Sequence, residues 1–466
     1  MRNMQNRRRF LKSTMAMPLM MMGGGSLLST FAGLNAHAFD NSGYRALVCV
    51  FLFGGMDCHD TVLPFDQTSY DDYAQIRGSL LASYAAQPGG STRTRDALLA
   101  LDPLTAQFGS RQFALPPQLS GMHQLFQQGR AAIVGNVGPL IEPTNRISAE
   151  SGSTALPARL FSHNDQQSTW MSFAPEGSQL GWGGRFGDAA AQGNANAEGV
   201  FSQISVGGNS VFLTGDSVSP YEIGANGVPS IRLVNAAGNE LRSIVRDHFI
   251  SAGSSRSNLF ERDLINLSQV SLDANDALAS ALQAGSPLST AFPASGLGAQ
   301  LRAVAEIMAV RGTLGASRQV FFVGIGGFDT HSAQAAELPA LQQDIGDSVA
   351  AFYAATQELG IANEVTTFTA ADFGRTLTVN GDGSDHGWGS HHFVVGGAVN
   401  GGDIYGDIPV SQLGHAQDAG NGRLIPSVSV EQFAAPLGRW FGLDDNQLAV
   451  ALPGLANFPG APLTFI

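Results

Sequence analysis

Aspartate and histidine residues occur together in several short, glycine-containing segments of this 466-residue sequence. The clearest case is GFDTHSAQ (327–334), in which Asp329 and His331 are two positions apart. Side chains at positions i and i+2 of an extended chain point to the same side, so this carboxylate and this imidazole can converge on one point. That point could hold a metal ion, a substrate or no ligand.

Three further segments contain the same residue types. FGGMDCHD (53–60) places Asp57 after two glycines, and LFSHNDQQ (160–167) contains Ser162. The longest segment, 372–402, carries more acids and histidines after an apolar run. The candidate metal ligands from all segments are Asp57, Asp329, His331, Asp372, Asp385, His386 and His391.

Carboxylates and neutral imidazoles are ligands of divalent cations, and we expect zinc, manganese, calcium or magnesium. Consecutive residues of a regular strand point to opposite faces. Asp385 and His386 can therefore act together only in a bent loop, and at most one of His391 and His392 is an expected ligand. Arg375 lies in the same segment, and its forked guanidinium suits a phosphate, sulfate or carboxylate group.

Four continuous apolar runs must position these side chains. Each ends in glycine, an acidic residue or both, and they cover residues 44–57, 131–138, 318–329 and 363–374. Such runs are typical of strands buried on both faces of a parallel sheet. Helical spacing at 297–308 and 341–352 alternates with them and predicts an α/β sandwich with a parallel-rich sheet. Ligands gather at the carboxyl ends of such strands, where the candidate acids fall.

Two regions differ from this alternation within the domain that we expect at 39–466. Residues from about 190 to 290 combine short strand-like runs with polar, helix-compatible sequence, and we interpret them as an inserted cap against the main sheet. The tail, 403–466, is rich in loops, with one helix expected near 430–441.

Residues 1–38 have the pattern of a twin-arginine signal peptide. Arg7 and Arg8 precede an apolar stretch, and an Ala-His-Ala sequence ending at residue 38 suits a signal peptidase. An uncleaved anchor is disfavoured, because glycines and a proline interrupt the stretch and it lacks the ~20 apolar residues of a membrane span. The prediction is a periplasmic or secreted protein.

The composition excludes some partners. The formal net charge is −13, and the signal region carries only basic charges, so its removal makes the chain more acidic. An acidic protein is a poor candidate for binding nucleic acid or anionic membrane surfaces. No later segment is long and apolar enough to span a membrane after signal cleavage. The sequence does not indicate an oligomeric state.

The sequence resembles the exported bacterial family called domain of unknown function 1501 in the segments FGGMD, FSHNDQQ, GGFDTHSAQ, DFGRT, NGDGSDHGWG and GGAVNGGDIYG. The resemblance extends from about residue 44 to 410 and more weakly to the end. That family is distantly similar to the alkaline phosphatase and sulfatase superfamily. The similarity implies a three-layer α/β/α sandwich, two metal sites and a nucleophile at a helix N-terminus.

The same similarity implies individual roles. Asp57 would match the acid that bridges the two metals. Asp329 and His331 would match ligands of one metal site, and Asp372 would match a ligand of the other. Ser162 follows the second predicted strand, where the superfamily keeps its nucleophile, and a helix beginning there would provide N-terminal amides and a favourable dipole.

The sequence departs from the superfamily pattern at the second metal site and at the expected nucleophile. His386 or His391 would match its late histidine, but Phe373 stands directly after Asp372, where metal-dependent members have a histidine. Either the loop containing Asp385 and His386 supplies the missing imidazole, or the site is altered. The FSHND sequence around Ser162 also lacks the usual small residues of a nucleophile motif.

The resemblance implies an exported, metal-dependent hydrolase of phosphate or sulfate esters, with a small-molecule or glycan substrate. Ser162 or a water would attack, and Arg375 would hold the non-bridging oxygens. The alternative is a non-enzymatic exported binding or accessory protein on the same scaffold. A serine hydrolase built on Ser162, His163 and Asp165 is disfavoured, because triad members seldom lie so close in sequence.

Overall fold

The computed structural model describes residues 39–88, 92–208, 210–228, 243–244 and 258–466. The predicted signal peptide, 1–38, lies outside the described residues. Residues Phe39–Ile466 group as one compact unit by their contacts. Within the described residues, no helix has both the length and the apolar character needed to cross a membrane.

The main sheet is mixed and mostly parallel, in the order β11-β5-β10-β9-β1-β8-β6-β7, with β12 beside β5. Its strands are β1 (Arg45–Leu52), β5 (Ala131–Gly138), β6 (Gln203–Ser205), β7 (Tyr221–Glu222), β8 (Arg318–Ile325), β9 (Val365–Ala371), β10 (Ser390–Gly396), β11 (Ile404–Gly406) and β12 (Val428–Ser429). A small antiparallel sheet contains β2 (Leu63–Pro64), β3 (Leu99–Ala100) and β4 (Phe113–Leu115).

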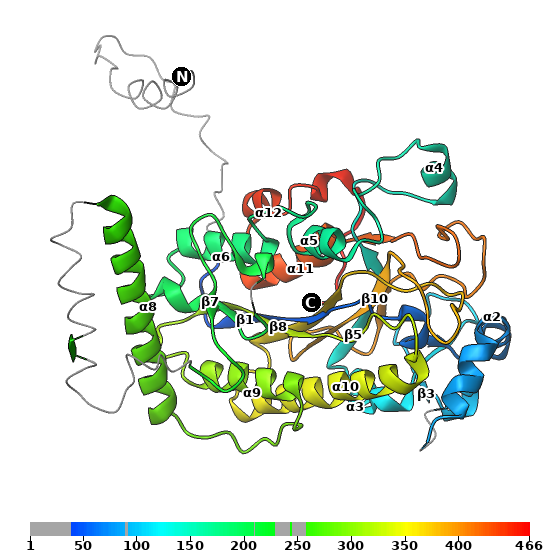
Figure 1. Cartoon of the computed structure of the whole chain (residues 1–466), viewed down its shortest axis with the longest axis horizontal. Coiled ribbons are helices and arrows are strands. Elements are labelled where there is room, and N and C mark those ends of the chain that lie inside the picture. Colours follow the sequence, from blue (N-terminus) through cyan, green and yellow to red (C-terminus); the bar gives the residue numbers. More distant parts are fainter. Residues whose placement is uncertain (1–38, 89–91, 209, 229–242, 245–257) are drawn as a thin grey trace, which may run out of the picture. The chain divides into compact units, whose positions relative to one another are not determined.

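Helices cover both faces of the main sheet (Figure 1). The α-helices are α2 (Gln67–Ala85), α3 (Ser120–Gln127), α4 (Arg146–Ser151), α5 (His163–Ser172), α6 (Trp182–Gln192), α8 (Leu259–Ala284), α9 (Gly296–Ala309), α10 (Gln334–Glu358), α11 (Val430–Phe441) and α12 (Asp445–Ala451). Short 3-10 helices are η1 (Cys58–Asp60), η2 (Arg95–Ala97), η3 (Pro117–Leu119), η4 (Gly199–Phe201), η5 (Val211–Leu213) and η6 (Leu455–Asn457).

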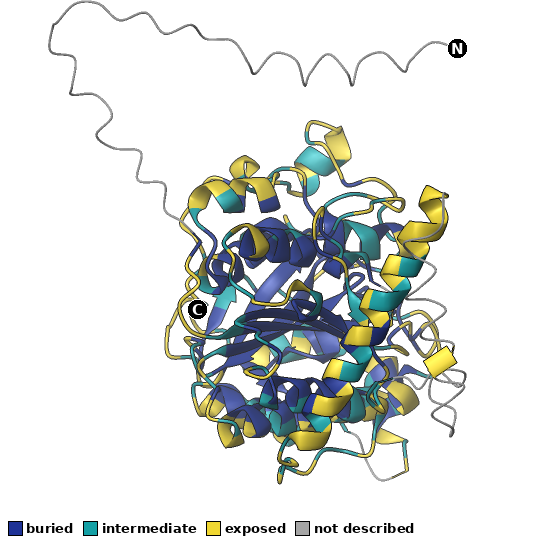
Figure 2. Cartoon of the chain, turned by 90° about the vertical axis from the view of Figure 1, so that its left-hand side faces the viewer, coloured by how far each residue is buried: buried dark blue, intermediate teal, exposed yellow. Residues whose placement is uncertain are grey.

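The central strand β1 shows why three layers form. Its side chains alternate between the two faces of the sheet. Val48 and Val50 join the core that contains Leu301 of α9, whereas Leu47 joins the core that contains Phe433 of α11. Both faces are therefore apolar, and each buried Val or Leu side chain contributes about 1.5–3 kcal/mol to folding. Figure 2 shows the strands buried between exposed outer helix surfaces.

This architecture confirms the expected three-layer α/β/α sandwich. The four predicted strands are present as β1, β5, β8 and β9, and the predicted helices are present as α9, α10 and α11. β1 pairs in parallel with both β8 and β9, so the carboxyl ends of these three strands lie at one edge. That edge is where the candidate residues Asp329 and Asp372 are found.

Two regions differ in detail from the sequence prediction. The apolar runs predict no strand between 375 and 402, but the last part of this segment forms β10, which runs antiparallel to both β9 and β5. The described part of the region 190–290 contributes β6 and β7 to the edge of the main sheet, in addition to the long helix α8. Part of that region therefore extends the sheet.

Candidate metal centre

The candidate site lies where three neighbouring parallel strands end. Asp329 is in the loop after β8, and Asp372 directly follows β9. The loop after β1 passes between them, and the Gly54 backbone N–H donates to Asp372 Oδ2 over 3.2 Å. Gly54 has φ +113°, and a Cβ there would lie 2.3 Å from the backbone nitrogen of Asp329. Only glycine lets the loops approach this closely.

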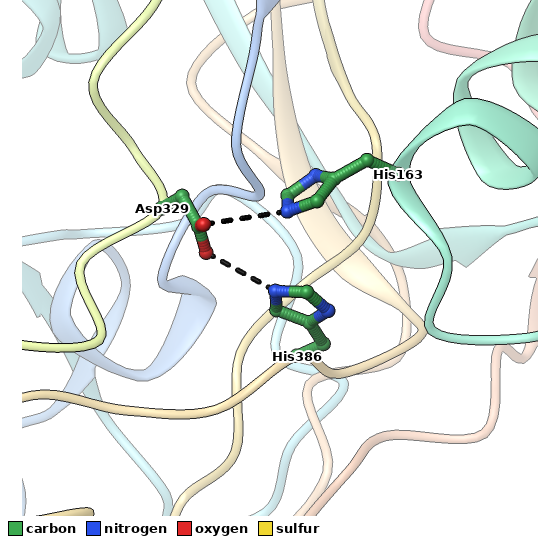
Figure 3. A group of neighbouring side chains, drawn as sticks. All are labelled: His163, Asp329 and His386. Carbon is green, nitrogen blue, oxygen red and sulfur yellow. Dashed lines mark hydrogen bonds and ion pairs between the residues drawn. The ribbon is translucent and has the colours of Figure 1, made fainter.

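Three imidazoles surround the Asp329 carboxylate. Nε2 of His331 and Nε2 of His386 each lie 3.1 Å from Asp329 Oδ1, and His163 Nε2 lies 3.4 Å from Asp329 Oδ2. Figure 3 shows His163 and His386 directed at Asp329 from separate segments of the chain. His163, Asp329 and His386 each offer one ligand atom, and these three atoms lie within 4.8 Å of one another. Such a compact group can hold a single cation.

The outer nitrogen of each imidazole is also held in place. The Nδ1 atoms contact oxygen acceptors in the pairs His163 with Asp372 Oδ2 (2.6 Å), His386 with the Phe161 carbonyl (2.8 Å) and His331 with Asp385 Oδ1 (3.3 Å). Metal-binding histidines typically donate their second ring N–H to such an acceptor, which fixes the tautomer and the ring orientation. All three rings therefore present Nε2 to the Asp329 carboxylate.

The charge states of His386 and Asp329 favour a cation between them. The Phe161 carbonyl can only accept, so His386 Nδ1 carries the proton and, in the neutral ring, Nε2 offers a lone pair. Burial lowers the pKa of His386, which favours this neutral form. Burial alone would raise the pKa of Asp329, but the hydrogen bond and charge of Arg375 outweigh it and lower the pKa. His386 Nε2 and Asp329 Oδ1, both electron-rich, thus face each other over 3.1 Å.

The Asp372 carboxylate supports His163 rather than joining Asp329. Asp372 is fully buried, and its Oδ2 accepts from His163, from Gly54 and from Gln167 Nε2 (2.8 Å). The hydrogen bond to Asp372 raises the pKa of His163. A buried carboxylate behind the imidazole increases its basicity as a ligand. We therefore place Asp372 behind the centre instead of among its direct ligands.

Arg375 is bonded to the protein itself. Its buried guanidinium donates from Nη1 to Asp329 Oδ1 (2.6 Å) and to the Gly54 carbonyl (3.1 Å). Nε contacts Ser384 Oγ at 3.3 Å, and Nη2 donates to the Ser384 carbonyl. Arg375 was expected to hold substrate oxygens. Its guanidinium instead pairs with Asp329 and donates to Gly54 and Ser384.

Asp57 lies outside the cluster, in a buried ion pair. Arg77 Nη1 donates to Asp57 Oδ2 (2.7 Å) and Arg77 Nη2 to Asp57 Oδ1 (3.1 Å), and both side chains are fully buried. Gln334 Nε2 also donates to Asp57 Oδ2 over 2.6 Å. Asp57 was expected to bridge two metal ions. In the structure Arg77 neutralises its carboxylate instead.

His391 also lies outside the cluster. It is on β10, where its buried Nδ1 accepts from the Asn136 backbone N–H at 2.9 Å. Burial lowers the pKa of His391 to about 3. Because strand pairing rather than a loop fixes its position, His391 is a neutral core histidine, and the late histidine of the cluster is His386.

Three buried histidines predict acid sensitivity. Burial lowers the pKa of His59, His391 and His392 to about 3, whereas each would titrate near 6.5 in the unfolded chain. Between these pH values the unfolded state binds more protons, so the free energy of unfolding falls as the pH falls. We expect these three histidines together to lower the free energy of unfolding by on the order of 3 kcal/mol between pH 6.5 and 5.5. Denaturant unfolding at each pH would measure the change.

Glu431 provides an internal control for that pH effect. Burial raises the pKa of Glu431 to about 7, so the folded state gains protons relative to the unfolded state in the same interval. Protonation of Glu431 offsets roughly 1 kcal/mol of the fall in unfolding free energy that the three histidines cause. The raised pKa of His163 acts in the same direction. The Glu431→Gln variant should therefore lose more stability on acidification than the parent. If unfolding free energy changed equally with pH in the parent and in Glu431→Gln, Glu431 would not have a raised pKa.

Ser162 is the N-cap residue of α5, directly before His163. Its hydroxyl donates to Asp165 Oδ2 over 2.9 Å. The preceding turn is unusual, because Phe161 has φ 71° and Arg159 has φ 52°, conformations that cost non-glycine residues about 1–3 kcal/mol each. This turn aims the Phe161 carbonyl at His386 while α5 presents His163 to Asp329.

His163 is the ligand candidate that sequence reasoning missed. The sequence pattern places it only in a disfavoured triad with Ser162 and Asp165, although the FSHND segment contains it next to the expected nucleophile. The Phe373 departure is explained here: its buried ring packs against His163 (centroids 4.8 Å apart) and His386 (4.6 Å). His163 of α5 brings an imidazole to the place where that histidine is expected, and the Phe373 ring packs against both imidazoles.

The fold and the cluster together define a three-layer α/β/α protein with a histidine- and aspartate-lined centre at the carboxyl ends of its strands. The chain belongs to the family described as protein of unknown function (DUF1501), whose model matches residues 44–457. This confirms the family resemblance seen in the sequence.

A search of curated proteins gave no match. Among solved structures, the chain is similar to that titled "Crystal structure of Ps i-CgsB in complex with k-i-k-neocarrahexaose", with 9% identity and a TM-score of 0.34. The alignment covers 87% of this chain and 74% of that chain. A likeness this distant carries no argument about the site.

Proposed function

We propose that the protein is an exported metal-dependent hydrolase of phosphate or sulfate esters, acting on small molecules or glycans in the periplasm or outside the cell. One observation carries the proposal. The Nε2 atoms of His163, His331 and His386 converge on the Asp329 carboxylate, and the Nδ1 atom of each ring contacts an oxygen acceptor.

The donor set fits a transition-metal ion better than an alkaline-earth ion. Imidazole nitrogens suit zinc and manganese, whereas calcium and magnesium prefer oxygen ligands throughout. His163, Asp329 and His386 would hold the ion, with His331 as a fourth ligand. We propose one ion rather than two, because Arg77 already pairs with Asp57. Such an ion would supply Lewis-acid chemistry, polarising an ester oxygen and lowering the pKa of water.

The chain's own residues would orient the reaction. Arg375 fixes the Asp329 carboxylate, and Asp372 fixes the His163 ring. The side chains of His163 and Asp329 are 30% and 42% exposed, so a substrate and water can reach them. Rigid support behind an accessible centre is the arrangement that positioned catalysis requires.

Metal content tests the proposal. The purified protein, treated with a chelator and reloaded with zinc or manganese, should retain about one ion per chain after desalting. His163→Gln should weaken metal affinity at least 10-fold. His123→Gln is the matched control, because His123 lies on α3 and its side-chain hydrogen bonds among the described residues go to the Ala100 carbonyl and Gln127. Absence of bound metal, together with no turnover of aryl phosphates and aryl sulfates, would refute the proposal.

Ser162→Ala tests the identity of the nucleophile. We expect kcat/KM on an aryl ester to fall less than about 10-fold, because the Ser162 hydroxyl donates its hydrogen bond to Asp165 and water can attack the ester instead. A loss of about 1000-fold or more, with metal content unchanged, would instead identify Ser162 as a covalent nucleophile.

The alternative is a non-enzymatic binding or accessory protein on the same scaffold. The observation favouring it is that Arg375, the arginine beside the centre, is committed to Asp329 and Ser384. A protein that binds metal stoichiometrically but turns over no phosphate or sulfate ester would favour this alternative.

A further inference from the structure

We infer that Arg423 binds the anionic group of the substrate at the rim of the metal centre. The inference rests on the proposed function, which requires a cation for the phosphate or sulfate oxygens. Arg375 does not provide it, because its buried guanidinium is bonded to Asp329, Gly54 and Ser384. Sequence reasoning assigned no role to Arg423, which lies in the loop-rich tail.

Arg423 is tied directly to the residues of the centre. Its Nε donates to the His386 carbonyl over 2.8 Å. Its guanidinium carbon lies 5.0 Å from the centroid of the Phe161 ring, and the Phe161 carbonyl accepts from His386 Nδ1. The guanidinium is thus stacked on the turn that leads into α5 and His163. Arginine stacked on an aromatic face is held in position without losing its capacity to bind an anion.

No carboxylate of the described residues forms an ion pair with Arg423. Its hydrogen bonds among the described residues go to the carbonyls of His386 and Gly420, the latter a long contact of 3.4 Å. The side chain is half-buried. Within the described part of the chain, these bonds use Nε and Nη1, so the remaining guanidinium N–H groups can donate to an external anion.

The charge balance of the centre also calls for an additional positive charge to bind the substrate anion. A divalent cation together with Arg375 would be balanced by the carboxylates of Asp329, Asp372 and Asp385. A phosphate or sulfate ester would then bring negative charge that the centre itself does not compensate. Arg423 supplies the additional positive charge, and its planar fork matches the geometry of tetrahedral oxyanions.

The loop that carries Arg423 is held by its own hydrogen bonds. Asp418 Oδ1 accepts from the backbone N–H groups of Gly420 (2.7 Å) and Gly422 (2.9 Å), on either side of the turn. Leu424 pairs with Asp418 through an isolated bridge. The guanidinium is therefore positioned before an anion arrives, which reduces the entropic cost of binding.

The test uses the full protein loaded with zinc or manganese and titrated calorimetrically with inorganic phosphate and with sulfate. Arg423→Gln should weaken the affinity for the preferred anion at least about 10-fold. Arg423→Lys, which keeps the charge, should recover part of that loss. Arg302→Gln is the control, because Arg302 lies on α9 and pairs with Glu306. Bound metal should be the same in all four proteins, since Arg423 is not a ligand.

The inference and the proposed function can fail separately. Equal anion affinity of Arg423→Gln and the parent, at equal metal content, would overturn the inference and leave the metal centre standing. Loss of metal from Arg423→Gln and Arg423→Lys alike would also overturn it, because Arg423 would then support His386 rather than bind an anion. A parent that binds no metal would refute the proposed function; phosphate or sulfate binding by that metal-free protein, weakened by Arg423→Gln, would still support anion binding by Arg423, and unchanged binding would overturn it.

Discussion

Replacing Asp329 by asparagine should abolish stoichiometric metal binding and reduce hydrolysis to background. Asp329 is the carboxylate on which all three imidazoles converge, and an amide in its place removes the negative charge that attracts the ion. Changes to residues behind metal ligands typically cost 10–100-fold in affinity, so loss of the central ligand should exceed about 100-fold. Metal analysis and competition with a chromophoric chelator would measure it.

Two variants calibrate this result. Asp385→Asn changes the group that contacts His331 Nδ1 and accepts from Asn380 Nδ2 (2.8 Å), but it removes no proposed ligand, so it should weaken metal affinity by a smaller factor of about 10–100. Asp347→Asn changes an exposed carboxylate on α10 and should have no effect. If Asp329→Asn bound metal as tightly as the Asp347 control, the cluster would not be a metal centre.

Replacing Arg77 by methionine should cost about 3–5 kcal/mol of unfolding free energy. Arg77 is fully buried, with Nη1 2.7 Å from Asp57 Oδ2 and 3.1 Å from Asp60 Oδ2. Its removal leaves two buried carboxylates without their cation, and that uncompensated charge is the source of the cost. Denaturant unfolding would measure the change, and Arg302→Met at the surface of α9 should stay within about 0.5 kcal/mol of the parent.

A double variant identifies the cause. Arg77→Met combined with Asp57→Asn should be more stable than Arg77→Met alone, because one of the two unpaired charges is gone. The single variant Asp57→Asn should also keep the full metal content, since Asp57 is paired with Arg77 rather than with a ligand of the centre. Loss of metal from Asp57→Asn would restore the two-metal expectation.

The Arg77 ion pair is connected to the centre through a chain of hydrogen bonds. Gln334 donates to Asp57 (2.6 Å) and accepts from Ser384 (2.7 Å). Ser384 in turn contacts Arg375, which holds Asp329. Asp57 is therefore linked to the cluster only indirectly, through Gln334, Ser384 and Arg375, and makes no contact with the proposed ligands.

The sequence predicted the scaffold because its signals are local. Runs such as RALVCVFL and RQVFFVGI are apolar at successive positions, and only a strand covered on both faces can bury them. The helical spacing between the runs then requires a parallel, layered arrangement. The same logic placed Asp329 and Asp372 at one edge, because the ends of parallel strands coincide. The SHHFVVG strand was missed because its polar start has no such run.

The sequence by itself therefore determined the α/β/α sandwich, the family and the edge of the sheet at which acids and histidines gather. Only the tertiary structure decided which of them meet. A strand fixes where a side chain starts, but ligand distances depend on loop conformation, such as the left-handed turn at Phe161 that brings α5 to the centre. Ion pairing is likewise non-local, because Arg77 of α2 binds Asp57 and separates it from the cluster.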